Sequence, residues 1–421
     1  MTHPLSAIPA TFHRGAPVGI TSVCSAHPVV IEAALRLAKE SGQPALIEAT
    51  CNQVNQDGGY TGMTPADFRT FVERIATRVG LSSDRIVLGG DHLGPNPWKD
   101  LQAEDAMAKA EAMIAGFAAA GFTKLHLDTS MGCAGEPVAL ADDITADRAA
   151  RLAAVAEAHK GSLDPVYVIG TEVPVPGGAL EELHDIAVTT PAAVRKTYQV
   201  HRDAFRAAGL DEAFSRVIAL VVQPGVEFGH ADVIHFEPGK ARDLTACLSE
   251  MPGIVFEAHS TDYQREAGLA ALVQNGFAIL KVGPWLTFAL REALYGLDAV
   301  ADVLDGQPPR GRLMAAMERV MLETPGSWKK YYEGDETELW LQRHFSYSDR
   351  IRYYWPTPEA EAAVAELRQR LEGKVIPETV ASQYLAGGFH KDGAEEILLS
   401  AVEDVLRIYL RACTGSVAEI G

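Results

Sequence analysis

Acidic and imidazole side chains recur in this sequence where short apolar runs end. Asp91 and His92 follow one such run, and His259 lies at the end of another. His126 and Asp128 stand two residues apart within a third run, which places both on one face of a strand. Buried polar groups cost free energy unless they are paired. The distribution therefore predicts a functional site at the ends of these runs.

His92 and His259 are the candidate metal ligands. Each is the last polar residue of a buried run, beside small or flexible residues, with carboxylates nearby in the sequence. Imidazole and carboxylate ligands suit zinc or another divalent first-row ion such as manganese. His126 is interpreted instead as a hydrogen-bonded core histidine. For Asp128 and Glu48, capping of the following helix stays open as an alternative to a role in the site.

Further polar residues complete the set at the ends of the runs. Those with amide or acidic side chains, together with one lysine, are Glu48, Asn52, Gln53, Glu172, Gln223, Glu227 and Lys281. Arg350 belongs to a basic and aromatic segment with Lys329, Lys330 and Arg352. This segment could clamp a phosphate, but a solvated surface stapled by aromatic side chains is the favoured interpretation.

The apolar runs alternate with amphipathic stretches and predict a parallel (β/α)₈ barrel. Eight runs occur, at about 18–26, 45–50, 85–90, 124–130, 166–173, 217–224, 254–260 and 277–284. Each could be buried on both faces, and in such barrels the chemistry lies at the carboxyl ends of the strands. A doubly wound open sheet is the rival. It usually has a glycine-rich turn after its first strand, and the turn SVCSAH has none.

The pattern changes after about residue 305. Helical stretches are expected at 311–323, 358–372 and 393–413, with a polar, aromatic segment at about 324–356. No flexible linker separates the two parts. We therefore expect an aldolase-like barrel over 1–305 and a helical extension, 306–421, packed on it.

Composition limits the possible partners and compartment. The net charge of −19 disfavours nucleic acid, and a small anion would need local lysine, arginine or metal. Five scattered cysteines without a CxxC motif favour the cytoplasm over a disulfide framework. No stretch has the length of a membrane helix. The absence of GxxxxGK[ST] and of a dinucleotide fingerprint argues against a kinase and a nucleotide cofactor.

Long motifs resemble the Z-type (GatZ/KbaZ) subunit family of tagatose-bisphosphate aldolase over about residues 15–410. They are GITSVCSAHPVVIEAAL, LIEATCNQVNQDGGYTGMTP, GGDHLGPNPW, HLDTSM, GTEVPVPGG, VVQPGVEFGH, EAHSTDYQ and AILKVGPWLTFALREA. The resemblance implies one of two roles. In one branch the Z subunit supports a separate catalytic aldolase subunit. In the other, members interconvert tagatose 6-phosphate and fructose 6-phosphate as 4-epimerases.

The family in turn resembles the catalytic class II aldolases. Four features of those aldolases have counterparts in this sequence. By this resemblance, their Asp-His pair corresponds to Asp91–His92 and their Glu before a Gly-Gly turn corresponds to Glu172. Their second metal histidine corresponds to His259, and their phosphate loop corresponds to 281–284. One departure is that the metal histidine expected after the sixth strand is missing. Glu227 or His230 could replace it as a ligand.

Aldol chemistry explains how a 4-epimerase could work. The hydrogen on C4 of a 2-ketohexose is not acidic, but a retro-aldol step can break C3–C4, and the aldehyde can recondense on its other face. We therefore expect a metal-dependent ketohexose-phosphate 4-epimerase, or alternatively a non-catalytic subunit of a class II aldolase, and in either case an oligomer. The expected roles are metal binding by His92, Glu227 and His259, proton transfer by Asp91 and Glu172, phosphate binding by Lys281 and Gly283 with Arg350, and other substrate contacts by Asn52, Gln53 and Asp128.

Overall fold

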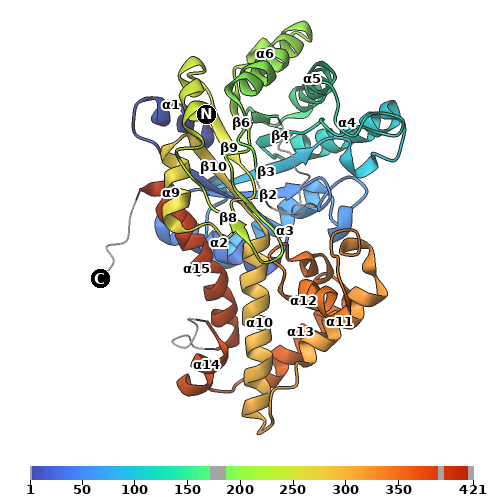
Figure 1. Ribbon diagram of the computed structural model, residues 1–421, viewed down its shortest axis with the longest axis vertical. Coiled ribbons are helices and arrows are strands. Elements are labelled where there is room, and N and C mark those ends of the chain that lie inside the picture. The colour runs from blue at the N-terminus through green and yellow to red at the C-terminus, as the bar shows by residue number, and fades with distance from the viewer. Residues whose placement is uncertain (1, 171–185, 387–392, 416–421) are drawn as a thin grey trace.

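Eight parallel strands form a closed barrel, as the sequence predicts. The computed structural model describes residues 2–170, 186–386 and 393–415 (Figure 1). Around the barrel the strands follow the order β1-β10-β9-β6-β5-β4-β3-β2, each parallel to its neighbours. Their bounds are β1 Ile20–Cys24, β2 Ala45–Thr50, β3 Ile86–Leu93, β4 Lys124–Leu127, β5 Val166–Ile169, β6 Val217–Val221, β9 Val255–Ala258 and β10 Phe277–Val282.

Helices follow the strands and form the outer layer. Local sequence sets several of their starts: Thr64 caps α3 in a capping box with Asp67, and proline occupies the first turn of α2, α3, α6 and α10. The helices of the barrel part are α1 Ala7–His13, α2 Pro28–Ser41, α3 Pro65–Val79, α4 Ala103–Ala119, α5 Asp142–His159, α6 Pro191–Ala207, α7 Asp211–Phe214, α8 Arg242–Ala246, α9 Glu266–Gln274 and α10 Pro284–Leu304.

The last helix completes the outer layer of the barrel. α15 (Ala394–Thr414) packs along α2, α9 and α10 and also contacts β1 (Figure 1). α10, which follows the eighth strand, extends away from the barrel towards the extension. The C-terminal helix therefore occupies the gap between α9 and α2. The division of the chain near residue 305 stays a prediction, but residues beyond it contribute directly to the wall of the barrel.

The helical extension packs along α10. It contains α11 Arg312–Glu323, α12 Glu336–Phe345, α13 Pro358–Leu371 and α14 Glu378–Tyr384, with the 3₁₀ helix η7 (Arg350–Tyr354) between α12 and α13. The aromatic segment at 324–356 thus contains α12 and η7, which the sequence pattern did not predict. Asp349 anchors η7, because its carboxylate accepts hydrogen bonds from Thr287 at 2.6 Å and Arg291 at 3.1 Å, both on α10.

The barrel interior changes from apolar to charged along its axis. At the amino ends of the strands, Leu46, Val87, Val166 and Ile218 form a small buried cluster with Leu5 of the N-terminal segment. Towards the carboxyl ends the interior contains Glu48, Lys124, His126, Glu257 and Lys281, all buried. Charged groups therefore collect at one end of the barrel, the mouth. Among the described residues, we find no helix with both the length and the apolar character to cross a bilayer.

Candidate active site

Four buried residues at the mouth form a group that could hold a metal ion. Asp91, His92, His126 and His259 each offer a ligand atom, and these atoms all lie within 4.8 Å of one another. The ring centroid of His92 lies 4.9 Å from those of His126 and His259, and the latter two are 5.4 Å apart. Two or three imidazoles beside a carboxylate suit a divalent first-row ion. We call this set the histidine cluster.

The backbone is strained where it presents this cluster. His92 has φ 48° and Ser260, next to His259, has φ 50°, a region that residues other than glycine rarely adopt. The register between β3 and β4 also shifts between Gly90 and Leu93, so Asp91 and His92 occupy a bulge. Bulges and strained dihedrals cluster at functional sites, where surrounding structure holds them.

Carboxylates and a carbonyl orient the three imidazoles. His92 Nδ1 lies 2.8 Å from Asp128, His126 Nδ1 lies 3.0 Å from Asp91, and His259 Nε2 lies 2.9 Å from Glu257. The second ring nitrogen of His126 lies 3.0 Å from the carbonyl oxygen of Gly170. Such partners hold the tautomer and orientation of metal-binding histidines. His126 therefore combines the core role expected for it with a place in the histidine cluster.

Beneath the cluster lies a network of buried ion pairs. Lys124 Nζ lies 2.6 Å from both Glu48 and Glu257, and Lys281 Nζ lies 2.7 Å from Glu48 and also contacts Asp91. All five side chains are at most 7 % exposed. The alternation of acids and lysines compensates charges that could not be buried alone. Gly89 makes room for it, since a Cβ there would lie 2.6 Å from the Glu48 carboxylate.

The electrostatics of the cluster favour metal binding. Burial lowers the pKa of His259 to about 3, so its imidazole is neutral and can offer a lone pair. Burial would raise the pKa of Asp91, but His92, Lys281 and His126 outweigh it and hold the pKa well below the usual range. Burial would likewise raise the pKa of Asp128, but its bond with His92 keeps it low. Both carboxylates are therefore charged at neutral pH.

Glu227 lies near the histidine cluster but outside it. It starts β7 (Glu227–Phe228), which pairs with β8 (Val233–Ile234) in a short hairpin after β6. Its carboxylate accepts hydrogen bonds from Ser260 at 3.2 Å and from the backbone of Phe228 at 2.9 Å. Burial raises the pKa of Glu227 to about 7. The other candidate replacement ligand, His230, instead contacts Ser346 of the extension.

Two groups expected to bind phosphate already have anionic partners. Lys281 belongs to the buried ion-pair network described above. The backbone N–H of Gly283 donates to the Asp262 carboxylate at 3.0 Å, as does that of Trp285 at 2.8 Å. Asp262 thus occupies the amino end of α10, where a phosphate would otherwise be favoured. Burial raises the pKa of Asp262 to about 6.

The remaining predicted site residues are dispersed. Asn52 is exposed in the loop after β2, whereas Gln53 is buried and accepts a hydrogen bond from the backbone of Thr50 at 2.9 Å. Arg350 lies in η7 with its guanidinium 3.3 Å from the ring centroid of Tyr331, and it donates to the carbonyl of Ser327. Glu172 lies outside the described residues.

Sequence reasoning missed Lys124 and Asp262. Lys124 could have been identified from the sequence, because it is the first residue of a short apolar run that is expected to be buried. A buried lysine requires an acidic partner. Asp262 carries no comparable signal. It follows the strand end in a loop, and its contact with the start of α10 depends on how β9 and β10 pair.

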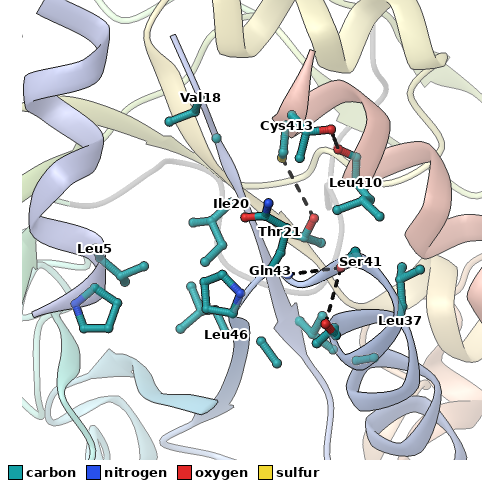
Figure 2. Close-up of a pocket in the computed structure, with 18 of the residues that line it drawn as sticks. Leu5, Val18, Ile20, Thr21, Leu37, Ser41, Gln43, Leu46, Leu410 and Cys413 are labelled. Atoms are coloured by element: carbon teal, nitrogen blue, oxygen red, sulfur yellow. Dashed lines mark hydrogen bonds between the residues drawn. The ribbon is translucent and has the colours of Figure 1, made fainter. Parts of the chain in front are cut away.

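The opposite end of the barrel is mainly apolar where the N-terminal segment meets β1 and β2. A cavity of 390 Å³ lies there, lined mainly by apolar side chains from the N-terminal segment, β1, β2, α2 and α15 (Figure 2). Leu5, Ile20, Leu46 and Leu410 are among them. The polar side chains labelled in Figure 2 include Thr21, which contacts Cys413, and Ser41, which bonds within its own turn and to Gln43. None of the described residues that line this cavity has an acidic, basic or imidazole side chain.

Fold and site together define a class of protein: a (β/α)₈ barrel with a buried His/Asp cluster at the carboxyl ends of its strands that could bind a metal. The chain belongs to the D-tagatose-1,6-bisphosphate aldolase subunit GatZ/KbaZ-like family, whose model matches residues 5–414. It is 55 % identical over 422 residues to a D-tagatose 6-phosphate 4-epimerase of Agrobacterium fabrum (strain C58 / ATCC 33970), covering 99 % of each chain.

A solved structure from Sinorhizobium meliloti 1021, described as a probable tagatose 6 phosphate kinase, is also similar. It is 58 % identical, superimposes with a TM-score of 0.87, and the match covers 94 % of this chain and 100 % of that one. The family resemblance inferred from the motifs is confirmed, and so is the barrel fold.

Proposed function

We propose that this protein is a metal-dependent 4-epimerase that interconverts D-tagatose 6-phosphate and D-fructose 6-phosphate. The observation that carries the proposal is the histidine cluster, buried at the mouth of the barrel and held by carboxylates. The Agrobacterium fabrum relative, 55 % identical over nearly its whole length, supports the substrate. The sequence contains no GxxxxGK[ST] motif, so the kinase description of the Sinorhizobium relative is not carried over.

The proposed reaction is a retro-aldol step followed by its reversal. A base removes the proton on O4, C4 becomes an aldehyde, and the electron pair of the C3–C4 bond moves towards the C2 carbonyl to give an enediolate. After the aldehyde turns by half a rotation, the same bond forms on its other face and the proton returns to O4. A divalent ion in the histidine cluster, proposed to be zinc, would polarise the C2 carbonyl and favour the negative charge that develops.

The geometry supports a revised assignment of roles. His92 and His259 stay the proposed imidazole ligands, and Asp91 joins them because it lies in the same cluster. Glu227 lies outside the cluster and has a pKa near 7, a value suited to accepting and returning a proton near neutral pH. We therefore assign the O4 proton to Glu227, with Glu172 as a second candidate, in place of Asp91. Asp128 is assigned to orient His92 through the 2.8 Å bond, not to contact substrate.

One experiment tests the activity directly. The purified protein is incubated with tagatose 6-phosphate, alone and with zinc or manganese, and the sugar is followed by carbon NMR. Fructose 6-phosphate that forms only with metal, and not after addition of a chelator, is the expected result. Accumulation of trioses would instead indicate an aldolase. No turnover of any ketohexose phosphate would refute the proposal.

A second role is favoured by the family description, which names an aldolase subunit. In that role the chain would support a catalytic class II aldolase. Co-purification tests it, because a stable complex with such an aldolase is required. The five cysteines are free thiols, which supports the cytoplasm as the proposed compartment for either role.

A further inference from the structure

We infer that Arg352, from the helical extension, binds the phosphate of the hexulose substrate, in a cavity between the extension and the mouth of the barrel. The inference rests on the proposed function for the identity of the ligand. It replaces Lys281, Gly283 and Arg350, the phosphate-binding groups expected from the sequence.

The cavity is large enough for the phosphate-bearing half of a sugar. Its volume is 470 Å³, within the range of small-molecule sites. Its walls come from the turn after β1, the loop after β2, the 3₁₀ helix η7, and helices α2, α3, α10, α13 and α15. The residues that matter for the argument are Cys24, Ser25, Gln53, Tyr60, Gly283 and Arg352.

The cavity adjoins the reactive groups. Cys24 ends β1 and lines the cavity, and its thiol donates to the Asp91 carboxylate over 3.6 Å. Burial raises the pKa of Cys24, so this donor stays a neutral thiol. Gly283, which also lines the cavity, directly follows β10. A sugar held at the histidine cluster could therefore extend its phosphate end into this space.

Arg352 is positioned before any ligand arrives. Its guanidinium donates to the carbonyl oxygens of Ser348 and, at 3.0 Å, Asp349, and to the Tyr353 hydroxyl at 2.9 Å. Arg352 as a whole is half-buried. Despite burial, which lowers it, the pKa of Arg352 is raised by Tyr353, Tyr60 and Asp349, so the guanidinium is a permanent cation. An oriented guanidinium is well matched to phosphate oxygens.

Other groups near the mouth that could bind the phosphate already have anionic partners. Lys281 is paired with Glu48 and Asp91, and Lys124 with Glu48 and Glu257. At the amino end of α10, the Asp262 carboxylate accepts the N–H groups that would otherwise favour an anion. A phosphate at either place would have to displace a carboxylate from its partners. Arg352 lines the open cavity instead, and Arg368, which also lines it, is paired with Glu395 at 2.8 Å.

The proposed reaction also favours a phosphate-binding group that lies away from the histidine cluster. Breaking C3–C4 of a hexulose 6-phosphate leaves the phosphate on the aldehyde half, which must turn before it recondenses. The other half, dihydroxyacetone, carries no phosphate. A phosphate held by the extension would retain the aldehyde half while its carbonyl turns, and it would leave the groups of the histidine cluster to the dihydroxyacetone half.

The test compares Arg352→Ala with Arg319→Ala. Arg319 lies on α11 of the same extension, is 60 % exposed, and serves as the control. Inorganic phosphate is the probe: its binding is measured by calorimetry, and its inhibition of tagatose 6-phosphate turnover by kinetics. Loss of a desolvated charged contact predicts a KM for tagatose 6-phosphate raised about 30-fold or more in Arg352→Ala, with phosphate binding abolished. Arg319→Ala should match the unsubstituted protein in both measurements.

Several outcomes would decide the matter. Unchanged phosphate binding and KM in a folded Arg352→Ala protein would overturn the inference, as would loss of both in Arg350→Ala alone. If Arg352→Ala does not fold, Arg352→Gln, which retains donors for the two carbonyls, replaces it with the same expectations. If the unsubstituted protein binds phosphate through Arg352 but does not turn over tagatose 6-phosphate, the anion site stands and the proposed function fails.

Discussion

The ammonium group of Lys124 lies 2.6 Å from the carboxylate of Glu257, and neither side chain is exposed to solvent. The same ammonium lies 2.6 Å from Glu48, and Glu257 in turn orients His259 at 2.9 Å. One buried cation thus connects β2, β4 and β9 beneath the histidine cluster. Its removal would leave two carboxylates with less compensation in the barrel interior.

Lys124→Met should therefore destabilise the fold severely. Removing one partner of a buried ion pair costs about 3–5 kcal/mol, because the remaining charge stays buried. Urea unfolding at neutral pH measures the loss. Lys109→Met is the control: Lys109 pairs with Asp57 at 3.0 Å on the surface, so its loss should change the free energy of unfolding by less than about 1 kcal/mol. Equal effects of the two substitutions would show that the buried network is not stabilising.

Metal content should separate ligands from the proposed base. His259→Ala removes an imidazole of the histidine cluster and should abolish both bound metal and turnover. Glu227→Gln should retain metal but lose about 100-fold or more in kcat, since general base catalysis contributes on that scale. Metal analysis of the purified variants, with steady-state kinetics, provides both measurements. His201→Ala, a buried histidine on α6 outside the cluster, controls for loss of a core imidazole. Metal loss in Glu227→Gln would make Glu227 a ligand.

Asp262 should make stability depend on pH. Burial raises its pKa in the folded protein from 3.8 to about 6, so the folded state favours the protonated form. This contribution to stability is fully present below pH 3.8 and is lost as the pH rises through about 6. The hydrogen bonds from Trp285 and Gly283, and after them the charge of Arg352, oppose this shift without cancelling it. Asp262→Asn cannot lose a proton here, so its free energy of unfolding relative to the unsubstituted protein should rise by up to about 3 kcal/mol between acidic and neutral pH.

Urea unfolding of both proteins, at about pH 4 and again at about pH 7, measures this difference. Asparagine can still accept the hydrogen bonds of Gly283 and Trp285, so the comparison isolates the charge. A difference that stays constant across this interval would mean that Asp262 titrates at an ordinary pKa.

Isotopic labelling should reveal cleavage of C3–C4. If the reaction is a retro-aldol step, ¹³C-labelled dihydroxyacetone added to the mixture should enter the first three carbons of the hexulose 6-phosphate, whereas C4 should keep its hydrogen in deuterated water. Carbon NMR follows both. In the Glu227→Gln protein, epimerisation and label incorporation should slow together. Deuterium at C4 would contradict the mechanism and indicate proton abstraction from that carbon.

Much of the fold could be predicted because its signals are local. Buried strands such as Ala45–Thr50 appear as short apolar runs, and α3 is marked by Thr64 followed by proline. The C-terminal helix was also expected, but its place between α9 and α2 was not. An amphipathic pattern shows that a helix has an apolar face; it does not show which of several apolar surfaces will cover that face.

The residues of the candidate site also fall into those that the sequence could predict and those that it could not. Asp91, His92 and His259 could be chosen from sequence because each is a polar residue at the end of a buried run, and the closed barrel brings such ends together. Their neighbours could not. Glu48 and Lys281 are separated by 233 positions in the chain, yet their side chains are hydrogen-bonded at 2.7 Å. The charge of a lysine expected to bind phosphate is therefore compensated by a carboxylate from a strand far away in the sequence.

The sequence by itself therefore determined the barrel, the end of it that carries the chemistry and the residue types available there, because strand periodicity and chain order encode them. Only the tertiary structure decided which charges compensate each other, as with Lys124 between Glu48 and Glu257, and which cation faces a cavity, as Arg352 does. These outcomes depend on the distances and burial of side chains from separate elements, and those quantities exist only after the barrel has closed and the extension has packed on it.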